Sequence, residues 1–371
     1  MVLLPSARAD LLIGLNQVVN LSFAVAVFAA IIGAGGLGNN LFAALKAMRL
    51  GPAMEAGIAI TLDRVFRAIA LKRSSHADAA VAAWSRQPSM ILGFSILAAG
   101  YLLGLAAPSL ATFPESWTLS SGAIWNEAIS TFNAAAGDAI GRFRDFLIIF
   151  VLRPVKDFLQ AVPWIATVGS LTVIALLLDG PRLAAKVALL LGFIVVTGHW
   201  GAAMTSLYLV VVGVVLAVLI GFPLGLAGAL SRRMSGFNDV LVDTIQTLPP
   251  FVYLVPFMMV LGIGDVPALA SIALYAAAPA IRYTQSGLLQ VRRSVLEAAS
   301  MSGCSSSQRL VLVQLPIALP HVMLGLNQTI IMAFGMLVVT ALVGTRGLEA
   351  QTLIALGKVD TGAGLVAGFC L

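Results

Sequence analysis

The sequence predicts an all-α integral membrane protein that crosses the bilayer about ten times. Of its 371 residues, 60% are hydrophobic and only 10% are charged, whereas soluble domains carry about 25% charged residues. The mean hydropathy is +0.99. A helical crossing of a ~30 Å hydrocarbon core uses about 20 apolar residues. This composition therefore argues against an attached globular enzyme.

The net charge of +6 and the isoelectric point near 9.7 do not indicate nucleic-acid binding. The basic residues are scattered between apolar runs, and no basic stripe with interleaved aromatic residues occurs. We interpret the charge as a topology signal. Cys304 and Cys370 are too few for a disulfide framework or a metal site.

Uncharged apolar segments mark the predicted crossings, at 15–33, 90–110, 163–178, 187–230, 248–264, 266–281 and 310–345. The segment 187–230 is too long for one crossing. We expect it to break at residues 198–201, where two glycines and a histidine favour a turn. A weaker candidate is 55–71, and 362–371 is about half a crossing.

Lys and Arg in the short loops predict the orientation. Residues of one loop face, which include Arg232, Arg233, Arg292 and Arg293, are expected in the cytoplasm, and the polar segment 111–141 in the periplasm. An amphipathic helix at 143–162 is expected to lie in the membrane interface. Four of the basic residues that depart from the orientation rule cluster in this helix or just before it: Arg142, Arg144, Arg153 and Lys156.

An internal repeat is the most informative feature of the chain. Residues 2–60 match residues 313–371 without a gap, and Gly14-Leu15-Asn16-Gln17 falls on Gly325-Leu326-Asn327-Gln328. We therefore expect three parts: 1–73 as the C-terminal part of a first module, 74–162 as a linker with one span, the periplasmic segment and the interfacial helix, and 163–371 as a second module. Both modules are expected to be truncated, either because the sequence is a piece of a longer tandem protein or because the gene starts further upstream.

A spaced motif between two predicted crossings points to a partner protein. It reads Glu297-Ala298-Ala299, three residues, Gly303, nine residues, and Val313-Gln314-Leu315-Pro316. A short helix that presents Glu297 can lie in a groove of a soluble partner, Gly303 permits a tight turn, and Pro316 marks entry into the next span. The motif resembles the EAA loop by which permease subunits of ATP-binding-cassette (ABC) importers engage their ATPase.

Further motifs resemble the glycine betaine/proline betaine and choline permease family. They are Gly221-Phe222-Pro223-Leu224-Gly225, the run from Asp243 to Pro256, Gly262-Ile263-Gly264, Pro279-Ala280-Ile281-Arg282 and Gly325-Leu326-Asn327-Gln328-Thr329. The resemblance implies a type I (MetI-like) ABC importer domain in the bacterial inner membrane. It also implies three kinds of partner: ATPase subunits, a periplasmic substrate-binding protein, and a second permease module or a homodimer.

The resemblance places nucleotide chemistry outside this chain. No G-x4-G-K-[ST] phosphate-binding loop, H-E-x-x-H or G-x-S-x-G motif is present. We therefore expect no cofactor, catalytic residue or metal here, and ATP with Mg on the partner ATPase. One departure separates the two copies: the glycine-rich Gly33–Gly38 turn of the first corresponds to Gly344–Glu349 in the second.

Polar and aromatic residues in the spans are candidates for a translocation path. Asn327 and Gln328 are expected near the cytoplasmic end of their span, where such side chains either join helices by hydrogen bonds or line a wet path. Phe251 and Tyr253 offer aromatic faces to a quaternary ammonium or serve in packing, and Pro256 bends its helix.

These features favour an importer permease for glycine betaine, proline betaine or choline. The alternatives are an ion-coupled secondary transporter or channel and an inactive permease fragment. A gradient-driven carrier usually has ionisable residues inside its spans, and the central segments here have almost none.

Overall fold

The computed structural model describes residue 95, residues 98–99, residues 122–247 and residues 250–371. Helices account for every regular element in these ranges, and no strand occurs among them. The all-α prediction is confirmed. The expected crossings at 15–33 and 55–71, most of 90–110, and the first copy of the repeat lie outside the described residues.

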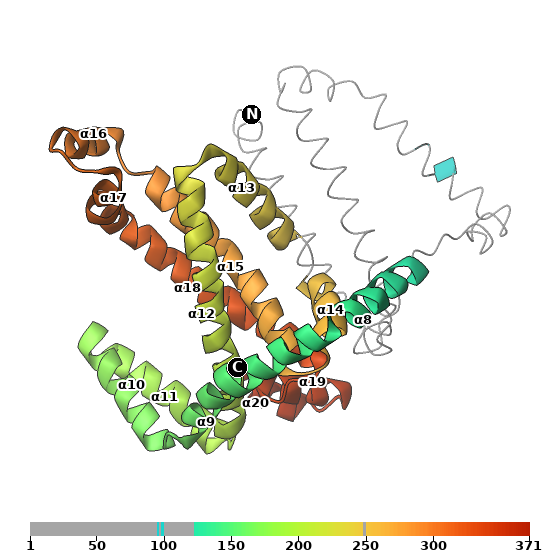
Figure 1. The fold of residues 1–371 in the computed structure, drawn as a ribbon. Coiled ribbons are helices and arrows are strands. Elements are labelled where there is room, and N and C mark those ends of the chain that lie inside the picture. The colour runs from blue at the N-terminus through green and yellow to red at the C-terminus, as the bar shows by residue number, and fades with distance from the viewer. Residues whose placement is uncertain (1–94, 96–97, 100–121, 248–249) are drawn as a thin grey trace.

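Three long helices form the centre of the described structure (Figure 1): α12 (Trp200–Leu230), α15 (Asp265–Leu289) and α18 (Leu315–Thr340). They belong to three helical segments that are long and apolar enough to cross a membrane, the third running without interruption from Ser306 to Val343. A bent pair of helices adds a fourth if it is counted as one span. The main buried core lies between these helices.

Small residues let α12 and α15 approach closely. A Cβ atom on Gly225 would lie 2.7 Å from the backbone oxygen of Ile281, and one on Gly221 would lie 2.6 Å from the Cβ of Ala280. Helices in lipid associate largely through such close backbone packing. The glycines of α12 that we quoted as a family motif therefore form its contact face with α15.

A turn separates α11 (Pro181–Val196) from α12, which confirms the predicted break at 198–201. Gly198 has a φ of 77°, a left-handed conformation that glycine adopts without steric cost. The preceding helix, α10 (Trp164–Asp179), pairs with α11 as a hairpin.

A helix is present where we expected the interfacial helix, and it is longer than expected. It begins in α8 (Gly122–Phe146), continues through a π-helical turn, η2 (Leu147–Leu152), and ends in α9 (Arg153–Ala161). It meets α10 at a bend of 88°. Exposed phenylalanines share this helix with the basic cluster, as expected of a helix lying along a membrane surface.

Two π-helical turns each end just before a proline. Pro154 follows η2, and Pro316 follows η3 (Arg309–Gln314). Because proline has no N–H, the carbonyl four residues earlier loses its ordinary helical partner. A π turn at this point redistributes the backbone hydrogen bonds without ending the helix.

The prediction that 248–264 forms one complete crossing is wrong in the length of the helix. The helix found there, α14 (Pro250–Leu261), has 12 residues, which at 1.5 Å per residue span only about 18 Å. The helix α13 (Arg232–Thr247) precedes it. Of the expected crossings in the described ranges, 163–178 corresponds to α10, whose 16 residues are also short for a 30 Å core.

The described chain ends in a pair of short helices, α19 (Leu348–Gly357) and α20 (Thr361–Cys370). A short 3-10 turn, η4 (Ala341–Val343), and the left-handed Gly344 (φ 86°) connect α18 to this pair. Leu348 and Cys370 pack with Ala203 and Met204 of α12 in a second, smaller core. Both short helices thus lie against the first turns of α12.

Candidate functional site

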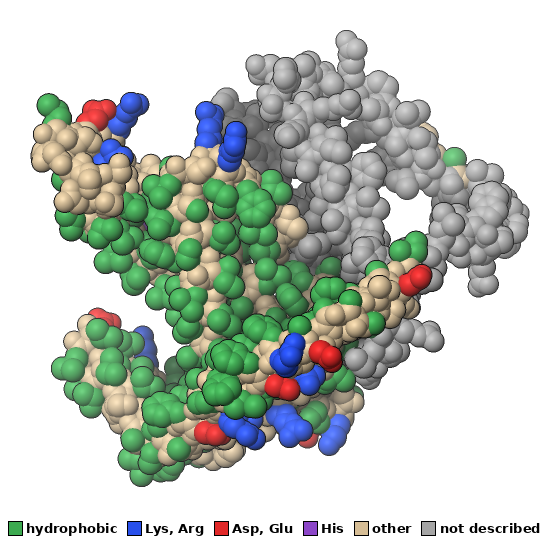
Figure 2. All heavy atoms as spheres, viewed as in Figure 1, with side chains coloured by type: hydrophobic (Ala, Val, Ile, Leu, Met, Phe, Trp, Pro, Cys, Tyr) green, Lys and Arg blue, Asp and Glu red, His purple; other side chains and the backbone are tan. Residues whose placement is uncertain are grey.

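The segment between α15 and α18 folds into a projection, which we call the α16–α17 knob (residues 292–308). It contains α16 (Arg293–Met301) and the single turn α17 (Ser306–Gln308). Figure 1 shows it extending beyond the ends of α15 and α18, on the side where α12 meets α13. Figure 2 shows charged side chains at this end and along α8 and α9, with a largely hydrophobic surface between.

Backbone geometry fixes the turn inside the knob. Gly303 has a φ of 81°, as a glycine at a tight turn requires. The N–H of Cys304 donates to the Ala299 carbonyl at 3.1 Å, which closes the C-terminus of α16. Ser305 and Gln308 then form a reciprocal capping box that starts α17. The expected tight turn at Gly303 is confirmed.

The EAA residues occupy different faces of α16. Glu297 and Ala298 are exposed and Ala299 is buried. The Nε of Arg293 donates to a carboxylate oxygen of Glu297 at 3.1 Å, one helical turn away. Met301 is 91% exposed at the end of the helix. The knob therefore presents a carboxylate, small side chains and an apolar tip on one projecting surface.

Leu315 and Pro316 lie at the start of α18, as expected, with Leu315 half-buried and Pro316 exposed. Pro316 does not mark the beginning of a helix, however, because the helical segment is continuous from Ser306. The π turn η3 carries the chain from the knob into the span without a loop.

The candidate path residues do not form one site in the described structure. Asn327 and Gln328 lie at the middle of α18 and not near its cytoplasmic end, which corrects our expectation. Asn327 is exposed and Gln328 half-buried, and within the described residues neither makes a hydrogen bond. These two side chains therefore do not join the described helices.

The aromatic candidates lie on α14. The Tyr253 ring is 6.3 Å from the Tyr275 ring, and its buried hydroxyl has no hydrogen-bond partner among the described residues. Pro256 is a half-buried residue inside the same helix. The side chain of Phe251 lies outside the described set. No hydrogen bond in the described part of the chain connects this group to Asn327 or Gln328.

Two polar joints connect the helices around the candidate residues. Arg282 of α15 bonds Asp243 of α13 at 2.5 Å. Nearby, the buried Asn238 donates to Gln285 at 2.8 Å and to the Leu224 carbonyl of α12 at 2.7 Å. Asp243 and Arg282 both occur in the motifs that resemble the permease family. The sequence alone did not indicate that they join α13 to α15.

The second joint surrounds Glu349, which is 1% exposed. The Ser206 hydroxyl of α12 donates to one carboxylate oxygen at 2.5 Å, and the Gly347 N–H donates to the other at 3.0 Å. The Leu348 N–H donates to Ser206 at 2.8 Å. Glu349, one of two charged residues that distinguish this segment of the second repeat copy, therefore joins α19 to α12.

Comparisons with known proteins identify the family. A model of binding-protein-dependent transport system inner membrane components matches residues 213–371, from within α12 to the end of α20. The Bacillus subtilis choline transport system permease protein OpuBD is 34% identical over 42% of this chain and 69% of its own length. The chain belongs to this family. The resemblance inferred from the motifs is confirmed.

The whole of this chain aligns with the trimethylamine N-oxide transport system permease protein TmoV of Pelagibacter ubique, with 36% identity. It covers 53% of that relative, and it spans about half the length of the curated relatives that match it throughout. A chain of the MetNI methionine ABC transporter, in inward-facing conformations, matches 44% of this chain and 82% of its own length with 22% identity and a TM-score of 0.39.

Proposed function

We propose that this chain is the permease of an ATP-driven importer of small methylated osmolytes. The observation that carries the proposal is the α16–α17 knob, which presents Glu297 and Met301 on a rigid projection at one end of two spans. In this proposal Glu297, Ala298, Ala299 and Gly303 dock against a partner ATPase, which binds ATP and Mg. The chain itself has no catalytic role.

Motion of the docked ATPase reaches the membrane through helices. A helix transmits rigid-body displacement because its internal hydrogen bonds resist bending. The uninterrupted run from Ser306 to Val343 supports such transmission, since no loop separates the knob from the span that begins near Leu315 and Pro316. On the other side of the knob, a short connection joins α16 to α15.

The substrate class follows from the relatives. Their names specify trimethylamine N-oxide, choline and glycine betaine. All three ligands carry a nitrogen bearing three methyl groups and a positive charge. We propose that Asn327, Gln328, Phe251, Tyr253 and Pro256 lie near the path that such a ligand follows.

The proposed assembly includes a periplasmic substrate-binding protein and either a second permease module or a second copy. Within this chain, 1–73 would complete a first module, 74–162 would link it through the interfacial helix, and 163–371 would form the second module. The family match, which begins at residue 213 and reaches residue 371, supports the last of these units.

Uptake by the reconstituted transporter tests the proposal. The full-length permease, its ATPase and its binding protein are placed in proteoliposomes, and uptake of radiolabelled trimethylamine N-oxide, glycine betaine and choline is measured. We expect uptake only with internal ATP. Uptake that persists with a hydrolysis-deficient ATPase and disappears when ion gradients are collapsed would instead establish an ion-coupled carrier.

A further inference from the structure

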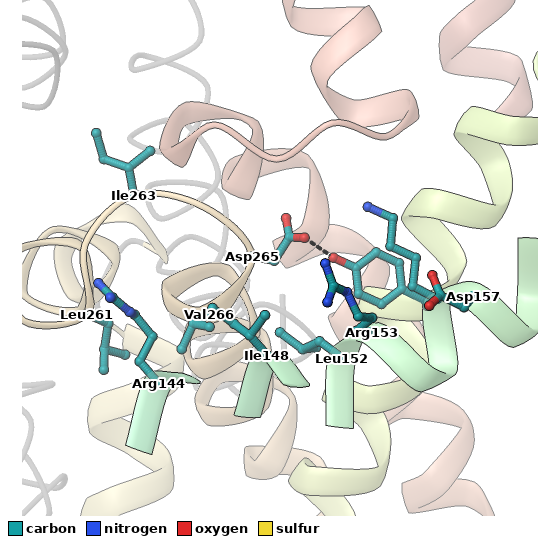
Figure 3. Close-up of a pocket in the computed structure, with 11 residues that line it drawn as sticks. Arg144, Ile148, Leu152, Arg153, Asp157, Leu261, Ile263, Asp265 and Val266 are labelled. Carbon is teal, nitrogen blue, oxygen red and sulfur yellow. Dashed lines mark hydrogen bonds between the residues drawn. The ribbon is translucent and has the colours of Figure 1, made fainter. Parts of the chain in front are cut away.

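A cavity of about 480 Å³ lies at the end of α12 and α15 opposite the α16–α17 knob. Figure 3 shows Arg144, Ile148 and Arg153 of the interfacial helix on one side and Leu261, Ile263 and Asp265 on the other. Small-molecule sites commonly measure about 300–1,000 Å³. Because neither the coupling motif nor the candidate path includes this cavity, its charged residues need a separate explanation.

Charges of both signs line the cavity without forming ion pairs with one another. The cations are Arg144, Arg153 and Lys156, and the anions are Asp157 and Asp265. Among the described residues, no ion pair joins any of these cations to either of these carboxylates. Arg144 pairs instead with Asp145 at 3.4 Å, and the Lys156 ammonium lies 5.5 Å from the Tyr208 ring centroid.

A hydrogen bond from a buried residue fixes the position of the Asp265 side chain. The hydroxyl of Tyr208, whose side chain is fully buried, donates to one carboxylate oxygen. The other oxygen remains without a donor from the described chain. Leu152 and Val266, both almost fully buried, supply apolar lining on the same side of the cavity.

A ligand that fits this lining carries two opposite charges and apolar groups. Arg153 and Lys156 can donate hydrogen bonds to its oxyanion, and hydrogen bonds between charged partners are stronger than those between neutral partners. The Asp265 carboxylate attracts its cationic end by charge alone. A methylated nitrogen suits this position because its charge is attracted to the carboxylate while its methyl groups favour the apolar lining.

We propose that this cavity binds a small zwitterion with a methylated cationic end, before the ligand enters the path between the helices. The proposal rests on the proposed import function and adds a binding site on the permease itself. It also gives a reason for the position of Arg153 and Lys156, which depart from the orientation rule.

Equilibrium dialysis of the permease–ATPase complex in nanodiscs, without the binding protein, tests this site. The probes are radiolabelled glycine betaine and choline, which share a trimethylammonium group but differ in that only betaine has a carboxylate. We expect Arg153→Gln to weaken betaine binding about tenfold, as loss of a charged hydrogen bond does, and to leave choline binding unchanged. Asp265→Asn should weaken both ligands.

Arg142→Gln is the matched control, because it removes the same charge from the same helix outside the cavity lining. Equal effects of the two arginine variants on betaine binding would overturn the site, and so would equal loss of betaine and choline binding in Arg153→Gln.

Absence of betaine binding in a wild-type complex that imports betaine with ATP would also overturn the site and leave the proposed function intact. Betaine binding that depends on Arg153 without ATP-driven uptake would keep the site and refute the proposed function.

A phospholipid headgroup presents the same paired charges, so bound lipid phosphorus is measured on each complex. Tightly bound phosphorus that falls in Arg153→Gln while betaine binding stays constant would assign the cavity to a lipid and overturn the proposal. Constant phosphorus together with reduced betaine binding supports the free osmolyte.

Discussion

The turn at Gly303 determines how the knob presents Glu297. Its φ of 81° is unfavourable for a residue with a branched Cβ, and such strain costs about 1–3 kcal/mol. No other atom lies within 4 Å of the position that a Cβ would occupy, so the cost arises from the backbone alone. We expect Gly303→Val to retain membrane insertion but to lose ATPase binding and ATP-driven uptake.

Gly236→Val controls for this change. Gly236 lies in α13, has an ordinary helical φ, and likewise has no atom within 4 Å of a built Cβ. Uptake and ATPase co-purification should stay normal in this variant. If Gly303→Val also leaves both quantities normal, Gly303 has no part in coupling.

Glu349 is the second residue whose environment makes a clear prediction. Its carboxylate accepts hydrogen bonds from the Ser206 hydroxyl and the Gly347 N–H in a buried setting. Removing one partner of a buried hydrogen bond costs about 1–3 kcal/mol. We therefore expect Glu349→Ala to lower the melting temperature of the purified permease, and Glu349→Gln, which keeps one of the two acceptor oxygens, to lower it less. Equal melting temperatures for wild type and Glu349→Ala would contradict this role.

At the scale of residues, local conformation was predictable and side-chain environment was not. The need for glycine at position 303 followed from its spacing within the motif. The burial of Glu349 depends on Ser206, which is more than a hundred residues away in the chain. Asn327 was wrongly expected near one end of its span, although it lies at the middle both of the apolar segment 310–345 and of α18.

Among the elements, the contact between α12 and α15 depends on Gly225. A Cβ there would lie 2.7 Å from the Ile281 carbonyl oxygen, a backbone atom that cannot move aside without shifting the helix. We expect Gly225→Ala to reduce the thermal stability of the permease, because overpacking costs about 1–3 kcal/mol. Gly201→Ala is the control, since nothing lies within 4 Å of its built Cβ. Similar melting temperatures for both variants would show that the helices separate freely at Gly225.

The predictions for elements succeeded where a strong local signal existed. The break between α11 and α12 followed from two glycines, and the left-handed Gly198 is the reason for it. The crossing at 248–264 was expected from hydropathy, which does not detect that α14 is too short to cross alone. The π turns before Pro154 and Pro316 depend on hydrogen-bond rearrangement and have no distinct sequence pattern.

In the whole molecule, two chemically different regions lie at opposite ends of the same helices. The α16–α17 knob follows α15 and precedes α18, and the cavity lined by Arg153 and Asp265 is built around the first residue of α15 and an early turn of α12. Because α12, α15 and α18 share one core, displacement of the knob shifts helices that also line the cavity. This arrangement fits the proposed importer, in which energy is applied at one end and ligand is received at the other.

The last prediction tests the orientation of these two ends in the membrane. Single cysteines replace Ile124 on α8, which is 69% exposed, or Met301 on the knob, which is 91% exposed, in a background without Cys304 and Cys370. A membrane-impermeant maleimide should label position 124 in cells with a permeable outer membrane, and position 301 only after the inner membrane is opened. Ala333→Cys, fully buried in α18, should stay unlabelled in both conditions. Labelling of position 301 from outside would place the knob in the periplasm, beyond reach of any ATPase, and would refute the coupling mechanism.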